Sequence, residues 1–190
     1  AYLAELASLQ LADIKHLILV DTKDPVSFFA YPGKKSYLVP DTCKVYTLAT
    51  PEQDATASLE KLAQSLGAAN TIPLLQTAQR PNCPRGKLTA AKVCKAVGHL
   101  LPENAILVDE ALTSGLMLSA MTAGAPRHVL ITLTGGAIGQ GLPSAIGAAV
   151  ACPQRPVLAL IGDGSSMYTI QALWTMAREN LNVTTIIFNN

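Results

Sequence analysis

An acidic side chain and an amide, placed at the ends of two consecutive apolar runs, form the strongest chemical signal in this sequence. Asp163 stands in GDG and ends the run PVLALIGD, whereas Asn190 ends the run VTTIIFNN. One amphipathic stretch separates the two runs, and the carboxyl ends of neighbouring parallel strands lie close together. Carboxylate and amide oxygens suit Mg²⁺, which is often bound together with phosphates. The spacing therefore predicts that Asp163 and Asn190 are ligands of Mg²⁺ at a diphosphate site.

The residues after Asp163 could hold the phosphate groups of such a ligand. The segment GSS, residues 164–166, and a helix expected to start near residue 169 offer hydroxyls and backbone N–H groups. GDG alone could be an ordinary turn, since Asp and Gly are common turn residues. The amide at the end of the next strand is what favours a ligand site over a plain turn.

These side chains must be positioned by alternating strands and helices. Short apolar runs predict strands at residues 16–21, 44–49, 105–110, 128–133, 156–163 and 183–190. Amphipathic stretches predict helices at about residues 1–10, 52–66, 89–101, 113–122, 139–151 and 169–180. Strands that are apolar on both faces and separated by helices indicate an α/β fold, with parallel sheets flanked by helices.

One stretch without periodicity divides the chain. Residues 67–88 contain three prolines, two glycines and two asparagines, which predicts a linker. Residues 1–66 hold two strands, too few for a complete doubly wound sheet, and are expected to be the C-terminal part of a Rossmann-like domain. Residues 89–190 are expected to form a second α/β unit that is also unfinished, with Thr89 as the N-cap of its first helix.

The composition excludes several classes of partner. The chain of 190 residues is 49% hydrophobic and 14% charged, with a net charge of +1 and no basic stripe, so neither nucleic acid nor an anionic membrane surface is expected. No uninterrupted apolar run reaches the roughly 20 residues of a membrane span. The four cysteines lack metal-ligand spacing, which favours reduced thiols, a cytoplasmic location and no zinc site. A small-molecule partner is therefore the expectation.

The order GDG, ALWTMARENLNV and NN resembles the cofactor signature of thiamine-diphosphate-dependent enzymes of the acetolactate synthase, benzoylformate decarboxylase and pyruvate decarboxylase group. The preceding segment TGGAIGQGLPSAIGAAVACPQRPVLALIGDG resembles the same cofactor-binding domain, so the likeness covers about residues 88–190. Residues 1–66 resemble the end of the group's middle domain with less specificity. The resemblance implies a thiamine-diphosphate-binding fold and a fragment of a three-domain chain.

The resemblance also implies roles for individual residues. Asp163 and Asn190 would be the side-chain ligands of Mg²⁺, with Gly164 and Ser165 at the diphosphate. The third protein ligand of the family is a main-chain carbonyl just past the second asparagine. Tyr168 would lie near the cofactor, although an aromatic residue packed at a helix start is an equal alternative.

Four more residues are assigned to the cofactor. Gly136 would offer its backbone to the aminopyrimidine, and Ile138 would be the bulky residue that holds the cofactor in its bent form. Thr113 and Ser114 follow a strand end in DEALTSG and could bond the diphosphate, or else cap the next helix. Acetolactate synthases usually have Gln and His near this place, and this sequence has neither.

The function implied is thiamine-diphosphate- and Mg²⁺-dependent decarboxylation of a 2-oxo acid with acyl transfer or release, as in acetolactate synthase. A simple decarboxylase of the benzoylformate type is the alternative, and the residues choose neither the substrate nor the acceptor. The glutamate that activates the cofactor in this family comes from another domain; Glu110 is not matched to it, so the isolated chain is predicted to be inactive. Homodimers or homotetramers are expected, while FAD in the middle domain is possible but not supported by these residues.

Two other classes stay open. A catalytically incomplete domain that only binds thiamine diphosphate would serve assembly or regulation. A nucleotide-binding α/β domain is disfavoured because neither GxGxxG nor a Walker-type GxxxxGK[ST] follows any predicted strand.

Overall fold

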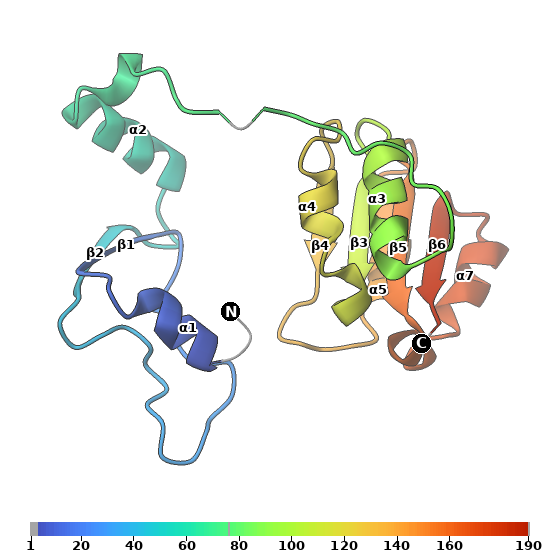
Figure 1. Cartoon of the computed structure of the whole chain (residues 1–190), viewed down its shortest axis with the longest axis horizontal. Helices are drawn as coiled ribbons and strands as arrows, with labels where there is room; N and C mark the ends of the chain where they lie inside the picture. The colour runs from blue at the N-terminus through green and yellow to red at the C-terminus, as the bar shows by residue number, and fades with distance from the viewer. Residues whose placement is uncertain (1–3, 76, 190) are drawn as a thin grey trace. The chain divides into compact units, whose positions relative to one another are not determined.

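The computed structural model describes residues 4–75 and 77–189. It divides into two compact units, Ala1–Leu74 and Leu75–Asn190, and the division falls within the stretch 67–88 (Figure 1). The interpretation of the first unit as part of a middle domain, and of the second as part of a cofactor domain, stays a prediction.

The described part of the first unit, residues 4–74, contains one pair of strands and two α-helices. Its elements are α1 (Ala4–Leu11), β1 (His16–Val20), β2 (Lys44–Ala49), α2 (Ala55–Ser65) and the 3₁₀ turn η1 (Ala68–Asn70). The strands are parallel and start in register, with His16 opposite Lys44. Asp54 caps α2 by accepting a 2.9 Å hydrogen bond from the N–H of Ala57.

The second unit is built on a sheet of four parallel strands in the order β4-β3-β5-β6. Its strands are β3 (Ile106–Glu110), β4 (Val129–Thr132), β5 (Val157–Gly162) and β6 (Val183–Phe188). Its helices are α3 (Ala90–Leu100), η2 (Leu112–Gly115), α4 (Leu118–Thr122), α5 (Gly141–Ala151), α6 (Asp163–Met167) and α7 (Ala172–Arg178). Thr89 caps α3 by accepting from the N–H of Lys92 at 3.3 Å, as predicted.

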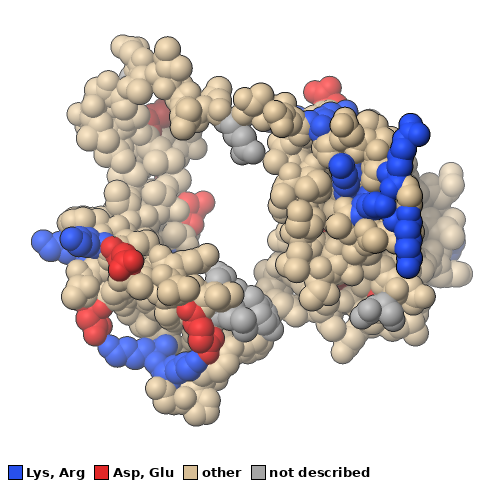
Figure 2. Space-filling model, viewed as in Figure 1, with Lys and Arg blue, Asp and Glu red and all other residues tan. Residues whose placement is uncertain are grey.

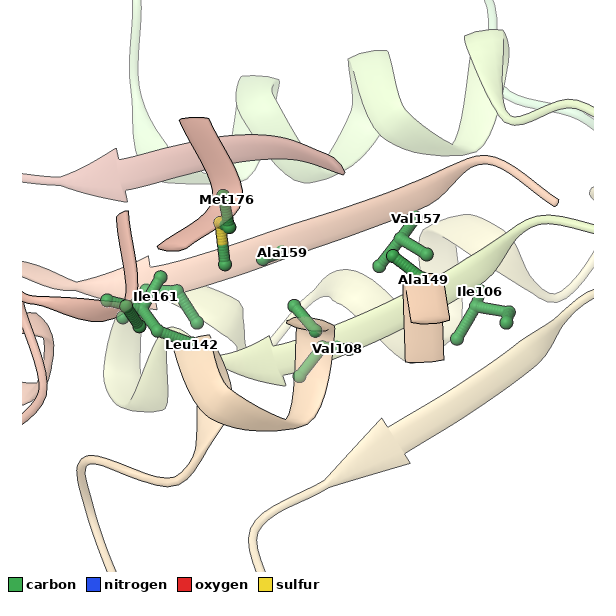
Figure 3. Packing of buried hydrophobic residues seen from close by; sticks show 10 residues of the cluster. Ile106, Val108, Leu142, Ala149, Val157, Ala159, Ile161 and Met176 are labelled. Atoms are coloured by element: carbon green, nitrogen blue, oxygen red, sulfur yellow. The ribbon is translucent and has the colours of Figure 1, made fainter. Parts of the chain in front are cut away.

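Helices cover both faces of this sheet. On one face, Val108 and Ile161 pack against Leu142 of α5, and Met176 of α7 joins the same cluster (Figure 3). On the other face, a second cluster joins the sheet to α3 and α4; its buried members are Cys94, Val97, Leu101, Ala105, Leu107, Ala111, Leu118 and Leu160. Alternate residues of β3 and β5 enter opposite clusters, which is why these strands are apolar throughout.

The connections open a crevice at the carboxyl ends of β3 and β5. After β3 the chain passes to α4 on one face, and after β5 it passes to α7 on the other. Glu110 is paired with Ile161, so the residues that follow the two strands start side by side. Ligands of open α/β sheets bind at such a switch point.

The predicted fold class is confirmed, since parallel sheets are flanked by helices and all six predicted strands are present with ends that differ by at most a few residues. Two helix predictions were inaccurate. The helix expected at 113–122 is divided into η2 and α4, and the helix expected near residue 169 is preceded by α6, which begins at Asp163 itself. Gly162 is extended (φ −69°, ψ 146°), so the chain enters a helix directly from the strand, without a separate turn.

Charged side chains do not dominate the surface. In the first unit, Lys35 forms an exposed ion pair with Asp41 at 3.0 Å, a kind of contact that adds little stability. In the second unit, basic side chains gather over the face that carries α3 (Figure 2). Within residues 4–75 and 77–189, no helix combines the length and the hydrophobicity needed to span a bilayer.

Candidate active site

A pocket of about 380 Å³ lies at the crevice between β3 and β5. It brings together seven residues that were selected from the sequence: Thr113, Ser114, Ile138, Asp163, Gly164, Ser165 and Tyr168. Ala111, Leu112, Gly162 and Phe188 complete the lining. A pocket of about 430 Å³ beside α3 has no titratable side chain in its lining, so the chemistry favours the smaller pocket.

The junction of β5 with α6 forms the polar floor of the pocket. The first N–H groups of a helix have no partner within the helix, and here they follow the strand end directly. Ser165 is buried with 3% exposure, and the Ser166 hydroxyl donates to the Asp163 carbonyl at 2.6 Å. Apart from the chain neighbours of Gly164 and the backbone of its own helix, no atom of the described residues lies within 4 Å of the place that a Cβ on Gly164 would take, so open space adjoins the start of α6. A phosphate group fits such a set of donors.

Asp163 is the acidic residue of this pocket and is partly buried. Asn190, its predicted partner in binding Mg²⁺, lies outside the described residues. Gly162 is paired with Phe188, which brings the end of β6 next to the end of β5. Across residues 4–75 and 77–189, no three His, Cys, Asp or Glu side chains form a metal-binding group, and the pairing of one carboxylate with one amide stays a prediction.

The segment after β3 supplies two hydroxyl side chains. Thr113 is exposed and Ser114 is half-buried, and both line the pocket. Neither Thr113 nor Ser114 caps the next helix, because Met117 is the N-cap of α4 and no side chain caps that helix. Leu112 has a φ of +50°, a conformation that a non-glycine residue rarely adopts and that is common near functional sites.

A glycine-rich loop before α5 contributes a further wall of the pocket and lies against the residues that follow α6. Ile138 lies in this loop, is 37% exposed and lines the pocket. Gly136 is in the same loop, two residues before Ile138, with a φ of +64°; it is not among the residues that line the pocket, and its contact with the cofactor stays a prediction. Tyr168 is 68% exposed and is the C-cap of α6, which disfavours the alternative of an aromatic residue packed at a helix start.

Glu110 organises this wall, a role that the sequence did not reveal. It ends β3, is only 1% exposed, and its two carboxylate oxygens accept hydrogen bonds from the N–H groups of Gly139 and Gly141. A Cβ on Gly141 would collide with the Glu110 side chain, so the glycine is required there. The available signal was an acidic residue at the end of β3, directly after Asp109, and the partners of Glu110 are distant in the sequence.

The other buried titratable groups do not supply a nucleophile. Burial raises the pKa of the Asp109 carboxyl, although the N–H of Ala111 donates to it at 3.0 Å and opposes the shift. Burial, and secondarily the nearby Asp109, raise the pKa of the Cys94 thiol, which is fully buried. A thiol in such surroundings is unreactive. All four cysteines are free thiols.

Comparison with known proteins agrees with the site. Residues 113–190 match the family described as thiamine pyrophosphate enzyme, C-terminal TPP binding domain; thiamine pyrophosphate is the same compound as thiamine diphosphate. The whole chain is 55% identical to the Mycobacterium tuberculosis protein named "Putative acetolactate synthase large subunit IlvX", and it covers 36% of that protein. It is 33% identical over 141 residues to benzoylformate decarboxylase of Pseudomonas aeruginosa, covering 72% of this chain and 26% of the relative.

Solved structures show the same fold. The thiamine diphosphate-dependent 4-hydroxybenzoylformate decarboxylase of Rhodococcus jostii RHA1 superposes with a TM-score of 0.69 at 25% identity, over 96% of this chain and 37% of the other. Benzoylformate decarboxylase of Polynucleobacter necessarius superposes with a TM-score of 0.63 at 20% identity, over 95% and 37% of the two chains. At that identity the second likeness concerns the fold alone.

The fold and the family match thus identify a domain of the thiamine pyrophosphate enzyme family, of the C-terminal TPP-binding type. This chain is a relative of the acetolactate synthase and benzoylformate decarboxylase group, and the predicted resemblance is confirmed. All residues of the chain match the Mycobacterium tuberculosis relative, and they span 36% of that protein's length.

Proposed function

We propose that this chain forms the diphosphate-binding and Mg²⁺-binding part of an enzyme that decarboxylates a 2-oxo acid. The pocket between the ends of β3 and β5 carries the proposal, because it combines three hydroxyl side chains, a carboxylate and the first turn of a helix with an apolar wall. A ligand with a diphosphate at one end and an aromatic ring at the other is complementary to such a lining.

Each part of the pocket has a role in this proposal. The hydroxyls of Thr113, Ser114 and Ser165 and the backbone at Gly164 would bind the diphosphate. Asp163 and Asn190 would hold the Mg²⁺ that neutralises it. Ile138 would press on the cofactor from the opposite wall, with Tyr168 beside it. When bound, thiamine diphosphate supplies the nucleophile and the electron sink for the decarboxylation.

The substrate and the fate of the acyl group have two candidates. The name of the relative at 55% identity favours an acetolactate-synthase-like reaction with acyl transfer. The names of the decarboxylase relatives favour simple decarboxylation of an aromatic 2-oxo acid. The segment of residues 109–115 has neither the Gln nor the His that is usual in acetolactate synthases, so the substrate is left open between the two candidates.

Calorimetric titration with thiamine diphosphate in the presence of Mg²⁺ tests the cofactor site. The unaltered chain should bind, and Asp163→Ala should weaken binding by about a hundredfold or more, because the ion loses a charged ligand and the diphosphate is left unneutralised. Asp41→Ala removes an exposed acid in the first unit and is the matched control, with no change expected. Equal affinity of Asp163→Ala and the unaltered chain would contradict the proposal, and binding of ATP or NAD in place of thiamine diphosphate would favour a nucleotide-binding domain.

Carbon dioxide release separates an enzyme from a domain that only binds the cofactor. The protein expressed from its whole gene should release CO₂ from pyruvate or benzoylformate, whereas the 190 residues alone should not, because no glutamate in them is matched to the activating residue of the family. Cofactor binding without turnover by the whole gene product would support the binding-only alternative. CO₂ release by the 190 residues alone would contradict the proposed need for a glutamate from elsewhere.

The cellular location and the oligomeric state of the enzyme are proposed from the resemblance and the composition. We place it in the cytoplasm as a homodimer or homotetramer, in accord with its reduced cysteines and with the family. FAD is left out of the proposal because no residue of this chain supports a flavin site.

A further inference from the structure

Glu110 is the described acidic side chain whose burial calls for a specific explanation. A carboxylate with 1% exposure is expensive to bury unless strong hydrogen bonds replace water. Those bonds come from the backbone N–H groups of Gly139 and Gly141, about thirty residues further along the chain. Its side chain therefore ties the end of β3 to the start of α5, and it is not among the residues that line the pocket.

The hydrogen bonds to Glu110 hold the loop that carries Ile138. Gly139 follows Ile138 directly and has a φ of +96°, so the backbone bends sharply at this point. The Gly139 N–H is held by Glu110, and its carbonyl accepts a 2.7 Å hydrogen bond from the Thr169 hydroxyl. The backbone N–H and C=O groups of Gly139 are thus both hydrogen-bonded to side chains from other parts of the chain. The backbone next to Ile138 is held from two sides.

Packing reinforces the same loop. A Cβ on Gly139 would lie 2.6 Å from the Cβ of Tyr168, so the loop and the segment after α6 are in close contact. Ile138 and Tyr168 both line the pocket. The position of the apolar wall therefore depends on the position of Gly139.

We infer that Glu110 is a positioning residue: its buried carboxylate holds the Gly139–Gly141 turn and thereby sets Ile138 against the ring end of the cofactor. The inference rests on the proposed function. Glu110 does not line the pocket, whose diphosphate end would be formed by residues 113–114 and 163–165. Loss of its carboxylate should therefore weaken recognition of the ring end and spare recognition of the diphosphate end.

Glu110→Gln is the sharpest variant. The amide keeps one acceptor oxygen, but its NH₂ group faces the second backbone N–H, so one of the two glycine donors loses its acceptor. Glu103→Gln makes the same chemical change at an exposed position in the same unit and is the matched control.

Two ligands separate the two ends of the site. Affinities are measured by calorimetry, with Mg²⁺ present, for thiamine diphosphate and for inorganic diphosphate. Glu110→Gln should lower the affinity for thiamine diphosphate by about tenfold to a hundredfold and leave that for inorganic diphosphate within about twofold. Asp163→Ala should lower both. Equal losses of affinity for both ligands in Glu110→Gln, or no loss for either, would overturn the inference. Failure of the unaltered chain to bind either ligand would overturn the proposed function and, with it, the cofactor role of Glu110.

Hydrogen exchange of the cofactor-free protein tests the tie without any ligand. In Glu110→Gln the amides of Gly139 and Gly141 should exchange at least about tenfold faster, while amides of β3 and β5 stay protected. If Glu110→Gln does not fold, Thr169→Val removes only the bond to the Gly139 carbonyl and should produce the same selective loss of thiamine diphosphate affinity, at a smaller size. Unchanged exchange in Glu110→Gln, or an unchanged ratio of the two affinities in Thr169→Val, would show that the loop is held by other contacts.

Discussion

The two units of this chain use similar strands but bury them to very different extents. In the second unit, Leu107 and Leu160 are fully buried on one face of the sheet, while Val108 and Ile161 are buried on the other. In the first unit, Ile18 and Tyr46 face the same way on neighbouring strands and are 57% and 49% exposed. An apolar strand becomes a core strand only where helices cover both of its faces.

The helices show the same contrast. In the second unit, α3 buries Cys94 and Val97, and α5 buries Leu142 and Ala145. In the first unit, α2 has no buried residue, although its sequence is as amphipathic as that of a packed helix. Most of the stability of the described structure should therefore reside in the second unit, since packing of an amphipathic face stabilises helices more than intrinsic propensity does.

The largest expected difference concerns leucines in the two sheets. Leu107→Ala should lower the free energy of unfolding of the second unit by about 3 to 5 kcal/mol, because it leaves a cavity in a fully covered face. Leu19→Ala, in the first unit at 6% exposure, should cost about 2 kcal/mol, since Leu19 belongs to neither of the two buried hydrophobic clusters. Urea denaturation followed by hydrogen exchange of the two sheets measures both losses, with Leu59→Ala at 48% exposure as the control. Equal losses for Leu107→Ala and Leu19→Ala would contradict the contrast between the units.

Removing a helix cap should destabilise the protein less than removing a buried leucine, and the effect should differ between the two units. Asp54→Ala and Thr89→Ala each remove a side-chain acceptor from the first turn of a helix and should cost about 1 kcal/mol. The same loss should open α2 far more than α3, because α3 is also held by its packing on the sheet. Amide exchange of the two helices checks this difference. Asp54→Asn and Thr89→Ser keep an acceptor and should stay close to the unaltered protein; a larger effect on α3 than on α2 would refute the interpretation.

The smallest expected effect concerns a buried charge in the second unit. Burial raises the pKa of Asp109 above its ordinary value of 3.8, so the native state binds its proton more tightly than the unfolded state does. The carboxyl therefore favours the native state fully only below the unfolded pKa, and this contribution is lost as the pH rises through the folded pKa. Asp109→Asn should stabilise the protein slightly at pH 7, where the carboxylate is charged, and by less near pH 4.

Thermal denaturation at the two pH values measures the effect of Asp109→Asn. Asparagine retains an oxygen that can accept from the N–H of Ala111. Asp41→Asn changes an exposed acid and should show no difference between the two pH values. A gain for Asp109→Asn that is the same at both pH values would mean that packing, rather than the charge, is responsible.

Local patterns in the sequence were sufficient to predict the strands and most of the selected residues that line the pocket. Apolar runs set the six strands because residues buried on both faces must be apolar. The strand ends then marked Thr113, Ser114, Asp163, Gly164 and Ser165, and the resemblance added Ile138 and Tyr168. These seven residues line one pocket, because parallel strands of one sheet end at the same edge.

Tertiary structure alone decided which strands became a core and how the pocket wall is held. Burial of Leu107 and exposure of Ile18 depend on helices that come from other parts of the chain, which a run of apolar letters does not reveal. Glu110 looked like an unremarkable acid at a strand end, and only the fold places its carboxylate against the N–H groups of Gly139 and Gly141. Periodicity and spacing along the chain determine local elements, whereas hydrogen bonds between distant segments require the folded arrangement itself.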